Sequence, residues 1–182
     1  MLSYGCWCNF YADRHHVAKG LGRPLDGIDL ACHHWQQCHQ CTKMDDMDCV
    51  PLLVEYDLSI TATKNSYGLI NQKVSCEGSE SGCAKWNCQC DANFAEQIVE
   101  LVARGQFDAA NSHSSEDFDS SRVCEWNGVY ETHDECCGDY PKRFPFSTDY
   151  GNRACCVAKT FNLAEGVCCQ DGSISSNRRL IQ

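Results

Sequence analysis

The residues with the greatest capacity for chemistry in this chain are its cysteines, which number 17 among 182 residues. Thiols at this density either bind zinc or form disulfides in an oxidising compartment. Four-ligand C-x2-C pairs at zinc-finger spacing are absent, although Cys38 and Cys41 form one isolated pair, so disulfides are favoured. Because 17 is odd, at least one thiol stays free or bonds another chain.

Histidine is the second residue type in this chain that could take part in chemistry. Five of the seven histidines lie close together in the sequence: His15, His16, His33, His34 and His39. Clustered imidazoles can bind zinc or copper. On a helix, however, His33 and His34 would point to adjacent rather than equal faces, which favours solvated or core histidines. We therefore expect no metal site and no cofactor.

The charge balance limits the partners. The formal net charge is -10 at pH 7, which argues against nucleic acid and anionic lipid because both require clustered Lys and Arg. An acidic surface suits solubility and, at most, a weak and diffuse association with Ca2+. No apolar run is long enough to span a bilayer, so no integral membrane segment is expected. Together with the cysteines, these features predict a secreted, extracellular protein.

Two helices and a hairpin are predicted in residues 1–107. Ile28, Cys32, Trp35 and His39 recur on one helical face, with Asp26 or Asp29 as the N-cap. A second helix is expected from Asp91, with apolar residues at 94, 95, 98, 99 and 102 and Gly105 at its end. Between them, residues 54–60 alternate, residues 64–68 break the run and residues 69–74 resume it, which indicates a hairpin.

The rest of the chain has a different composition. Residues 108–122 are polar, acidic and serine-rich, which predicts a solvated linker. Residues 123–182 hold seven cysteines, including three vicinal pairs, and are too few to fold on an apolar core alone. Because neighbouring cysteines rarely bond each other, each member of a pair should reach a different part of the chain. We expect a loop-rich module of short strands and turns.

Three blocks of the sequence resemble secreted phospholipase A2. Residues 4–8, Tyr-Gly-Cys-Trp-Cys, are similar to Y-G-C-Y-C at that family's calcium loop. Residues 22–26, Gly-Arg-Pro-Leu-Asp, followed by a helix from Asp29, are similar to its G-x-P-x-D and D-x-C-C motifs. Residues 76–91 have the spacing of its second cysteine block and end in C-x-C-D. The resemblance implies a mainly α, disulfide-rich fold with an antiparallel helix pair and a small β-hairpin, followed by the C-terminal module.

The resemblance also implies a disulfide pattern: Cys8–Cys32, Cys38–Cys90, Cys76–Cys88 and Cys49–Cys83. A further bridge of the family would need cysteines at Ala31 and Gln97, and both are missing together. Cys6 and Cys41 remain, and we expect one of them to tie this domain to the second module.

The positions that match the family's catalytic residues depart from its pattern. Trp35 stands where the family has its general-base histidine, and Gln36 where it has its calcium-binding aspartate. Indole donates a hydrogen bond but accepts no proton at neutral pH, and a glutamine offers Ca2+ one neutral oxygen. The loop 9–13 also lacks the family's glycines. Asp91 is retained, and we expect it to cap the second helix and to bond His39.

A shorter resemblance concerns the C-terminal module. Residues 155–172, which carry two of the Cys-Cys pairs, resemble the di-cysteine repeats of galaxin-type matrix proteins. The function implied is non-catalytic: an extracellular structural or matrix protein, a pseudo-phospholipase, that contacts other extracellular chains. A homo-oligomer with an interchain disulfide would use the odd cysteine. Two other classes stay open: a non-hydrolytic lipid-binding module, and a residual hydrolase or the inactive subunit of a phospholipase.

Overall fold

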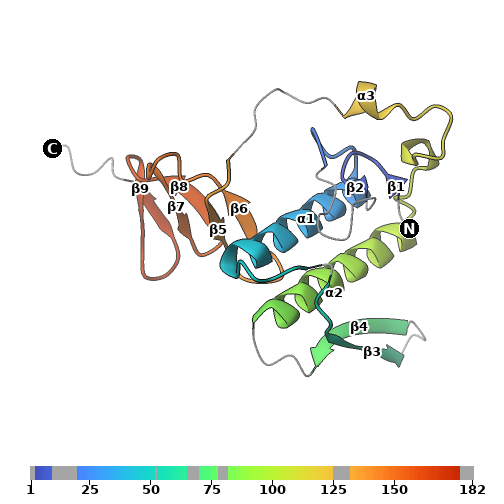
Figure 1. Ribbon diagram of the computed structural model, residues 1–182, viewed down its shortest axis with the longest axis horizontal. Coiled ribbons are helices and arrows are strands. Elements are labelled where there is room, and N and C mark those ends of the chain that lie inside the picture. The colour runs from blue at the N-terminus through green and yellow to red at the C-terminus, as the bar shows by residue number, and fades with distance from the viewer. Residues whose placement is uncertain are drawn as a thin grey trace.

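Two long helices form the centre of the molecule, α1 (Gly27–Asp45) and α2 (Gly82–Ala103). They lie side by side and run antiparallel (Figure 1). The computed structural model describes residues 3–9, 20–51, 53–64, 70–77, 82–124 and 132–176.

Helix α1 begins where the sequence predicts. The side chain of Asp26 accepts a hydrogen bond from the backbone N–H of Asp29, which satisfies one of the free donors of the first turn. Asp29 is itself fully buried, and its carboxylate accepts the backbone N–H groups of Cys6, Trp7 and Leu25. Asp29 thereby attaches the N-terminal turn to the start of α1.

Helix α2 begins earlier than predicted. It starts at Gly82, so Asp91 lies in the middle of the helix, and the expectation that Asp91 caps it is wrong. Residues 82–90 lack an apolar stripe, but disulfides from Cys83, Cys88 and Cys90 hold this part of the helix against its surroundings. Tertiary cross-links therefore decide this boundary. The far end is close to the prediction, since Gly105 follows the helix with a φ of 72°.

The predicted hairpin is present as β3 (Asp57–Lys64) and β4 (Ile70–Glu77). The two strands pair antiparallel, with Leu58 opposite Cys76. The expected turn at 64–68 falls mostly outside the described residues. The hairpin packs beside α2, to which Cys76–Cys88 joins it (Figure 1).

A small core lies where the N-terminal strands meet the helices. Strands β1 (Ser3–Tyr4) and β2 (Cys8–Asn9) pair with each other, and the core comprises Tyr4, Cys8, Ile28 and Cys32. Phe94, Ile98 and Leu101 of α2 pack against it. Gly5 between the strands has a φ of 56°, and a Cβ there would lie 2.3 Å from the Asp29 carboxyl carbon, so only glycine fits.

Eight disulfides account for sixteen of the cysteines, and Cys169 is the free thiol. Four of the bridges join the same cysteines as the pattern implied by the resemblance: Cys8–Cys32, Cys38–Cys90, Cys76–Cys88 and Cys49–Cys83. The members of each vicinal pair take different partners or, for Cys169, none within the chain.

Residues 108–124, which include the segment expected to be a solvated linker, are mostly exposed and are attached to the N-terminal strands. They contain the short helices η1 (Ala109–Asn111) and α3 (Ser120–Val123). The backbone N–H of Gly5 donates to Asn111, and that of His113 donates to Ser3. The His113 ring donates from Nε2 to the Gly5 carbonyl at 2.7 Å, and Cys124 is bonded to Cys6. Backbone hydrogen bonds and one disulfide hold this segment in place, and neither can be predicted from its amino-acid composition.

Residues 132–176 form a module of two-stranded antiparallel hairpins. Along the chain they are β5–β6 (Glu135–Cys137, Phe144–Phe146), β7–β8 (Arg153–Cys156, Lys159–Asn162) and β9–β10 (Gly166–Cys168, Ile174–Ser176). The first hairpin lies against the end of α1, and the others extend away from the helices (Figure 1). Because this quarter of the chain is built of strands, "mainly α" describes only the first part of the molecule.

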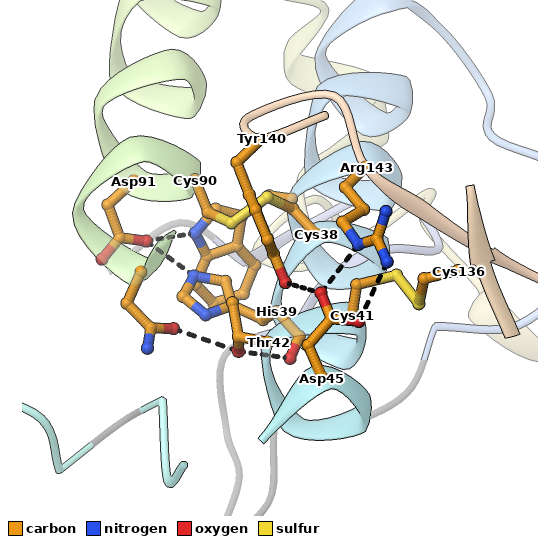
Figure 2. Close-up of a disulfide and its surroundings, with 12 residues drawn as sticks. Cys38, His39, Cys41, Thr42, Asp45, Cys90, Asp91, Cys136, Tyr140 and Arg143 are labelled. Atoms are coloured by element: carbon orange, nitrogen blue, oxygen red, sulfur yellow. Dashed lines mark hydrogen bonds and ion pairs between the residues drawn. A yellow bond between two sulfur atoms is a disulfide. The ribbon is translucent and has the colours of Figure 1, made fainter. Parts of the chain in front are cut away.

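Both cysteines left over from the implied pattern are bonded to later parts of the chain, where one such bond was expected, and of the two only Cys41 joins a helix to the module. Cys41 of α1 pairs with Cys136 of β5, and Cys6 pairs with Cys124. Arg143 adds a salt bridge to Asp45 at 2.7 Å, beside the Cys41–Cys136 bond (Figure 2). Among the described residues, no helix has the length and apolar character needed to cross a membrane.

Candidate functional site at Trp35 and Asp91

The site is built around the carboxylate of Asp91, which accepts hydrogen bonds from three side chains. Trp35 donates from Nε1 to Oδ1 at 2.5 Å, and His39 donates from Nε2 to the same oxygen at 2.8 Å. Figure 2 shows His39 of α1 turned toward Asp91 of α2. Tyr56, just before β3, donates its hydroxyl to Oδ2. The predicted His39–Asp91 hydrogen bond is confirmed.

The position of each group follows from the helix pair. Trp35 and His39 are one turn apart on α1 and so share a face, with the two rings edge to face at 4.5 Å. The neighbouring Cys38–Cys90 disulfide holds this face against α2 and brings Asp91 within reach. Trp35 also packs near Phe94, with ring centroids 5.7 Å apart.

The electrostatics of the site keep Asp91 ionised. Burial alone would raise the pKa of Asp91, but the hydrogen bonds from His39, Tyr56 and Trp35 hold it below its ordinary value. Burial and the adjacent carboxylate raise the pKa of Tyr56, which stays a neutral donor. A partly buried negative charge is therefore balanced by three fixed donors.

A proton acceptor for chemistry is difficult to find in this arrangement. Trp35 only donates, and the carboxylate of Asp91 already accepts from three groups. His39 uses Nε2 to bond Asp91, so its acceptor is Nδ1, which is buried and lacks a hydrogen-bond partner among the described residues. His39 is only 4% exposed, so a substrate water has little access to that atom.

Gln36 joins the two ends of the segment that resembles a calcium loop. Its Oε1 accepts the backbone N–H of Gly20 at 3.0 Å, and its Nε2 donates to the carbonyl of Trp7 at 2.6 Å. An amide performs both tasks because it carries an acceptor and a donor, whereas a carboxylate could not bond the Trp7 carbonyl. Residues 10–19, and with them most of the expected glycine-poor loop, lie outside the described residues.

The histidines do not converge on one point. His33 stacks on the Trp7 ring, with centroids 3.9 Å apart, while His39 faces Asp91. Burial, with smaller contributions from the nearby His34 and His133, lowers the pKa of His33 to about 4. His15 and His16 lie outside the described residues, within which no three His, Cys, Asp or Glu side chains are grouped as metal ligands would be.

Two contributors were missed by sequence reasoning. Tyr56 was assigned only to an alternating strand pattern, and Trp7 only to a motif, although its ring packs on His33 and its indole donates to the Gly22 carbonyl. The sequence did hold a signal for Tyr56. It is a tyrosine between the two expected helices, and a carboxylate site between helices needs hydrogen-bond donors of this kind.

Comparison with known proteins finds similarity to phospholipases A2. No protein-family model matches the chain. The acidic phospholipase A2 beta-bungarotoxin A3 chain of Bungarus multicinctus is 27% identical over 123 residues, which are 68% of this chain and 66% of that protein. A phospholipase A2 of Ovis aries is 27% identical over 99 residues, 54% of this chain and 70% of that protein. The basic phospholipase A2 beta-bungarotoxin A-AL2 chain of B. multicinctus is 30% identical over 92 residues, 50% of this chain and 56% of that protein.

These similarities and the helix pair agree on a phospholipase A2-like scaffold. The chain spans 66% of the length of the A3 chain and 56% of that of the A-AL2 chain. The eight disulfides and this similarity fit an extracellular protein.

Proposed function

We propose that this chain is a non-catalytic extracellular protein that uses a phospholipase A2-like scaffold for structural contacts with other protein chains. The observation that carries the proposal is the closed network at Asp91, where Trp35, His39 and Tyr56 donate to one carboxylate. Such a network stabilises the helix pair and, among the described residues, engages the polar side chains that could act as a base beside it.

Gln36 supports the same conclusion from the other side of the site. Phospholipase chemistry would need a hard cation held by carboxylate oxygen, and Gln36 supplies a neutral amide whose two polar atoms are already bonded to Gly20 and Trp7. The amide makes a direct link between loop and helix. Any association with Ca2+ is then the weak, diffuse kind expected of a chain with a net charge of -10.

The order of disulfides in the module supports assembly with another chain. In each Cys-Cys pair the first cysteine bonds an earlier part of the chain: Cys136 to Cys41, Cys155 to Cys137 and Cys168 to Cys156. The second cysteine bonds the next hairpin, as Cys137 and Cys156 do. Cys169 is the second member of the third pair, and every other cysteine of these 182 residues is already bonded. Its partner would therefore come from outside them.

The surface next to Cys169 is suited to such a contact. Val167 of β9 is 53% exposed and Ile174 of β10 is 39% exposed, on the last hairpin of the series. Val167 and Ile174 lie on opposite faces of this hairpin. An exposed apolar side chain two residues from an unused thiol suits a contact in which another chain covers Val167 and adds a covalent bond.

The first experiment tests catalysis. The oxidised protein is incubated with phosphatidylcholine vesicles and Ca2+, and fatty acid release is measured beside the Ovis aries phospholipase A2 as a positive control. We expect release no faster than from vesicles alone. Calcium-dependent release that disappears in Asp91→Asn would overturn the proposal.

The second experiment tests assembly. Protein is recovered with its thiols blocked at lysis and run on a non-reducing gel. We expect covalent oligomers that collapse on reduction and are missing from Cys169→Ser. A monomer with a titratable thiol and no dimer in sedimentation would remove the support for assembly.

A second candidate function is the inactive subunit of a phospholipase. Two relatives are named as A chains of beta-bungarotoxin, so similar scaffolds occur as one named chain of a larger protein. The same gel distinguishes the two candidate functions. An inactive subunit would be found bonded to a different, active chain, whereas a structural oligomer would not.

A further inference from the structure

A pocket of about 780 Å³ lies between α1, α2 and the turn of the β5–β6 hairpin. Leu30, His33 and His34 line it from α1, Gln97 from α2, and Lys142 and Phe144 from the module. It is separate from the Asp91 site, because Trp35, His39 and Tyr56 are not among its lining residues. Its volume falls within the roughly 300–1,000 Å³ typical of small-molecule sites.

The lining combines an apolar surface with basic groups. Leu30, in the first turn of α1, is 41% exposed and lines the pocket together with Phe144 and Pro141. No Asp or Glu lines the pocket among the described residues, although the chain carries a net charge of -10. Lys142 is exposed at its edge beside His34. The pocket is thus an acid-free, basic region of an acidic protein.

The walls of the pocket are held in place before any ligand enters. Cys41–Cys136 bonds the hairpin to α1, and Arg143 donates to both carboxylate oxygens of Asp45, at 2.7 and 3.0 Å. Tyr140 stacks on Trp86 of α2 with ring centroids 5.2 Å apart. A preformed cavity loses less entropy on binding than one that must be ordered by its ligand.

The histidines can contribute as hydrogen-bond donors. Burial is the main reason that the pKa values of His33 and His34 are below their ordinary value, so both rings are neutral near pH 7. Arg143 is already paired with Asp45, which leaves Lys142 as the cation best placed for a ligand.

We propose that this pocket binds an aliphatic carboxylate, with the carboxylate at Lys142 and His34 and the hydrocarbon chain along Leu30 and Phe144. The apolar surface favours a ligand with a hydrocarbon chain. The basic edge, which has no carboxylates, favours a negative head group over a positive one. This inference is independent of the proposed function, since it uses a different face of the helix pair.

Binding of dodecanoate to the oxidised protein, measured by isothermal titration calorimetry at pH 7.5, tests the proposal. We expect saturable binding of dodecanoate, at least about tenfold tighter than that of dodecyltrimethylammonium, which carries the same chain with the opposite charge. Acetate, which has the charge without the chain, should not bind measurably. Equal affinity for the two amphiphiles, or no saturation by dodecanoate, would overturn the proposal.

Two variants with matched controls test the two halves of the site. Lys142→Gln should weaken dodecanoate binding about tenfold, while Lys85→Gln, an exposed lysine elsewhere on α2, should not change it. Leu30→Gln should weaken binding by a similar factor, while Leu53→Gln, at a residue 53% exposed outside the pocket, should not. If the controls change affinity as much as the pocket variants, the site is not the one proposed.

The location is tested separately by amide and indole chemical shifts. Titration with dodecanoate should shift the signals of Leu30, His34 and Phe144 and leave the Trp35 indole N–H unmoved. Shifts centred on Trp35 would refute this pocket and would favour lipid binding at the Asp91 site. Either result is distinct from the vesicle assay, which reports hydrolysis.

Discussion

The helical part and the C-terminal module use the same covalent bond for different purposes. In the helical part, disulfides surround a small core of Tyr4, Cys8, Ile28 and Cys32, covered by side chains of α2. In the module, the buried hydrophobic residues are Cys137, Phe146 and Cys156, while Tyr150, Val157 and Leu163 are exposed. Disulfides supplement apolar burial in the first region and replace it in the second.

This difference indicates which changes in sequence and length each region can tolerate. A module joined hairpin to hairpin by successive Cys-Cys pairs needs contacts only between neighbours, so its length and its exposed side chains are little constrained by a common core. The helix pair is constrained by shared packing and by the partly buried carboxylate of Asp91, which three donors must reach together. Trp35 and Gln36 both make hydrogen bonds within that packing, Trp35 to Asp91 and Gln36 to Gly20 and Trp7.

The largest effect should come from removing one disulfide in each region. Cys156–Cys168 and Cys76–Cys88 both close loops with a sequence separation of 12, so the loop-entropy contribution is matched. Replacing either pair by alanine should cost ~2–4 kcal/mol locally. The module variant should lose the ordered β7–β10 strands, whereas the other should keep α1 and α2 folded, as followed by hydrogen exchange. Equal loss in both regions would contradict the comparison.

A second effect should come from the partly buried carboxylate of Asp91 in the helical part. Asp91→Asn replaces an acceptor of three hydrogen bonds by an amide that can accept at only one atom, and we expect a loss of about 2 kcal/mol in the free energy of unfolding. The matched change in the module is Asp134→Asn, where an exposed carboxylate accepts from the backbone N–H and hydroxyl of Thr148. Urea unfolding should show a smaller loss there, because water can replace those bonds. The reverse order would show that the Asp91 network contributes little.

The smallest effect should be a pH dependence located in α1. The pKa of His33 is lowered in the folded protein from 6.5 to about 4, mainly by burial, so the unfolded chain binds more protons between these values. His33 therefore stabilises the fold fully above its unfolded pKa, and this contribution is lost as the pH falls from about 6.5 toward 4. Thermal unfolding of His33→Gln should show a shallower decline across this window than the parent. His34→Gln should have the same sign, since burial also lowers the pKa of His34. A slope unchanged by both variants would contradict this assignment.

The elements that sequence reasoning predicted well are those whose signals are local. The Asp26 cap, the face shared by Trp35 and His39, and the alternation before β3 all lie within a few residues of what they specify. The start of α2 was missed because residues 82–90 owe their helical form to disulfides and packing more than to an apolar stripe. Asp91 was assigned to a cap for the same reason, although its bond to His39 was foreseen from the resemblance.

The sequence by itself determined which atoms are available: an indole at Trp35, an amide at Gln36, an odd number of thiols and an acidic balance of charge. Only the tertiary structure decided which of these atoms meet. Cys6 and Cys124 are separated by 118 residues and Cys41 and Cys136 by 95, and segment 108–124 lies along the N-terminal strands through backbone hydrogen bonds. Hydrogen bonds and disulfides form between groups that are close in space, and packing of the whole chain sets that distance, whereas local sequence specifies only the conformation of a few neighbouring residues.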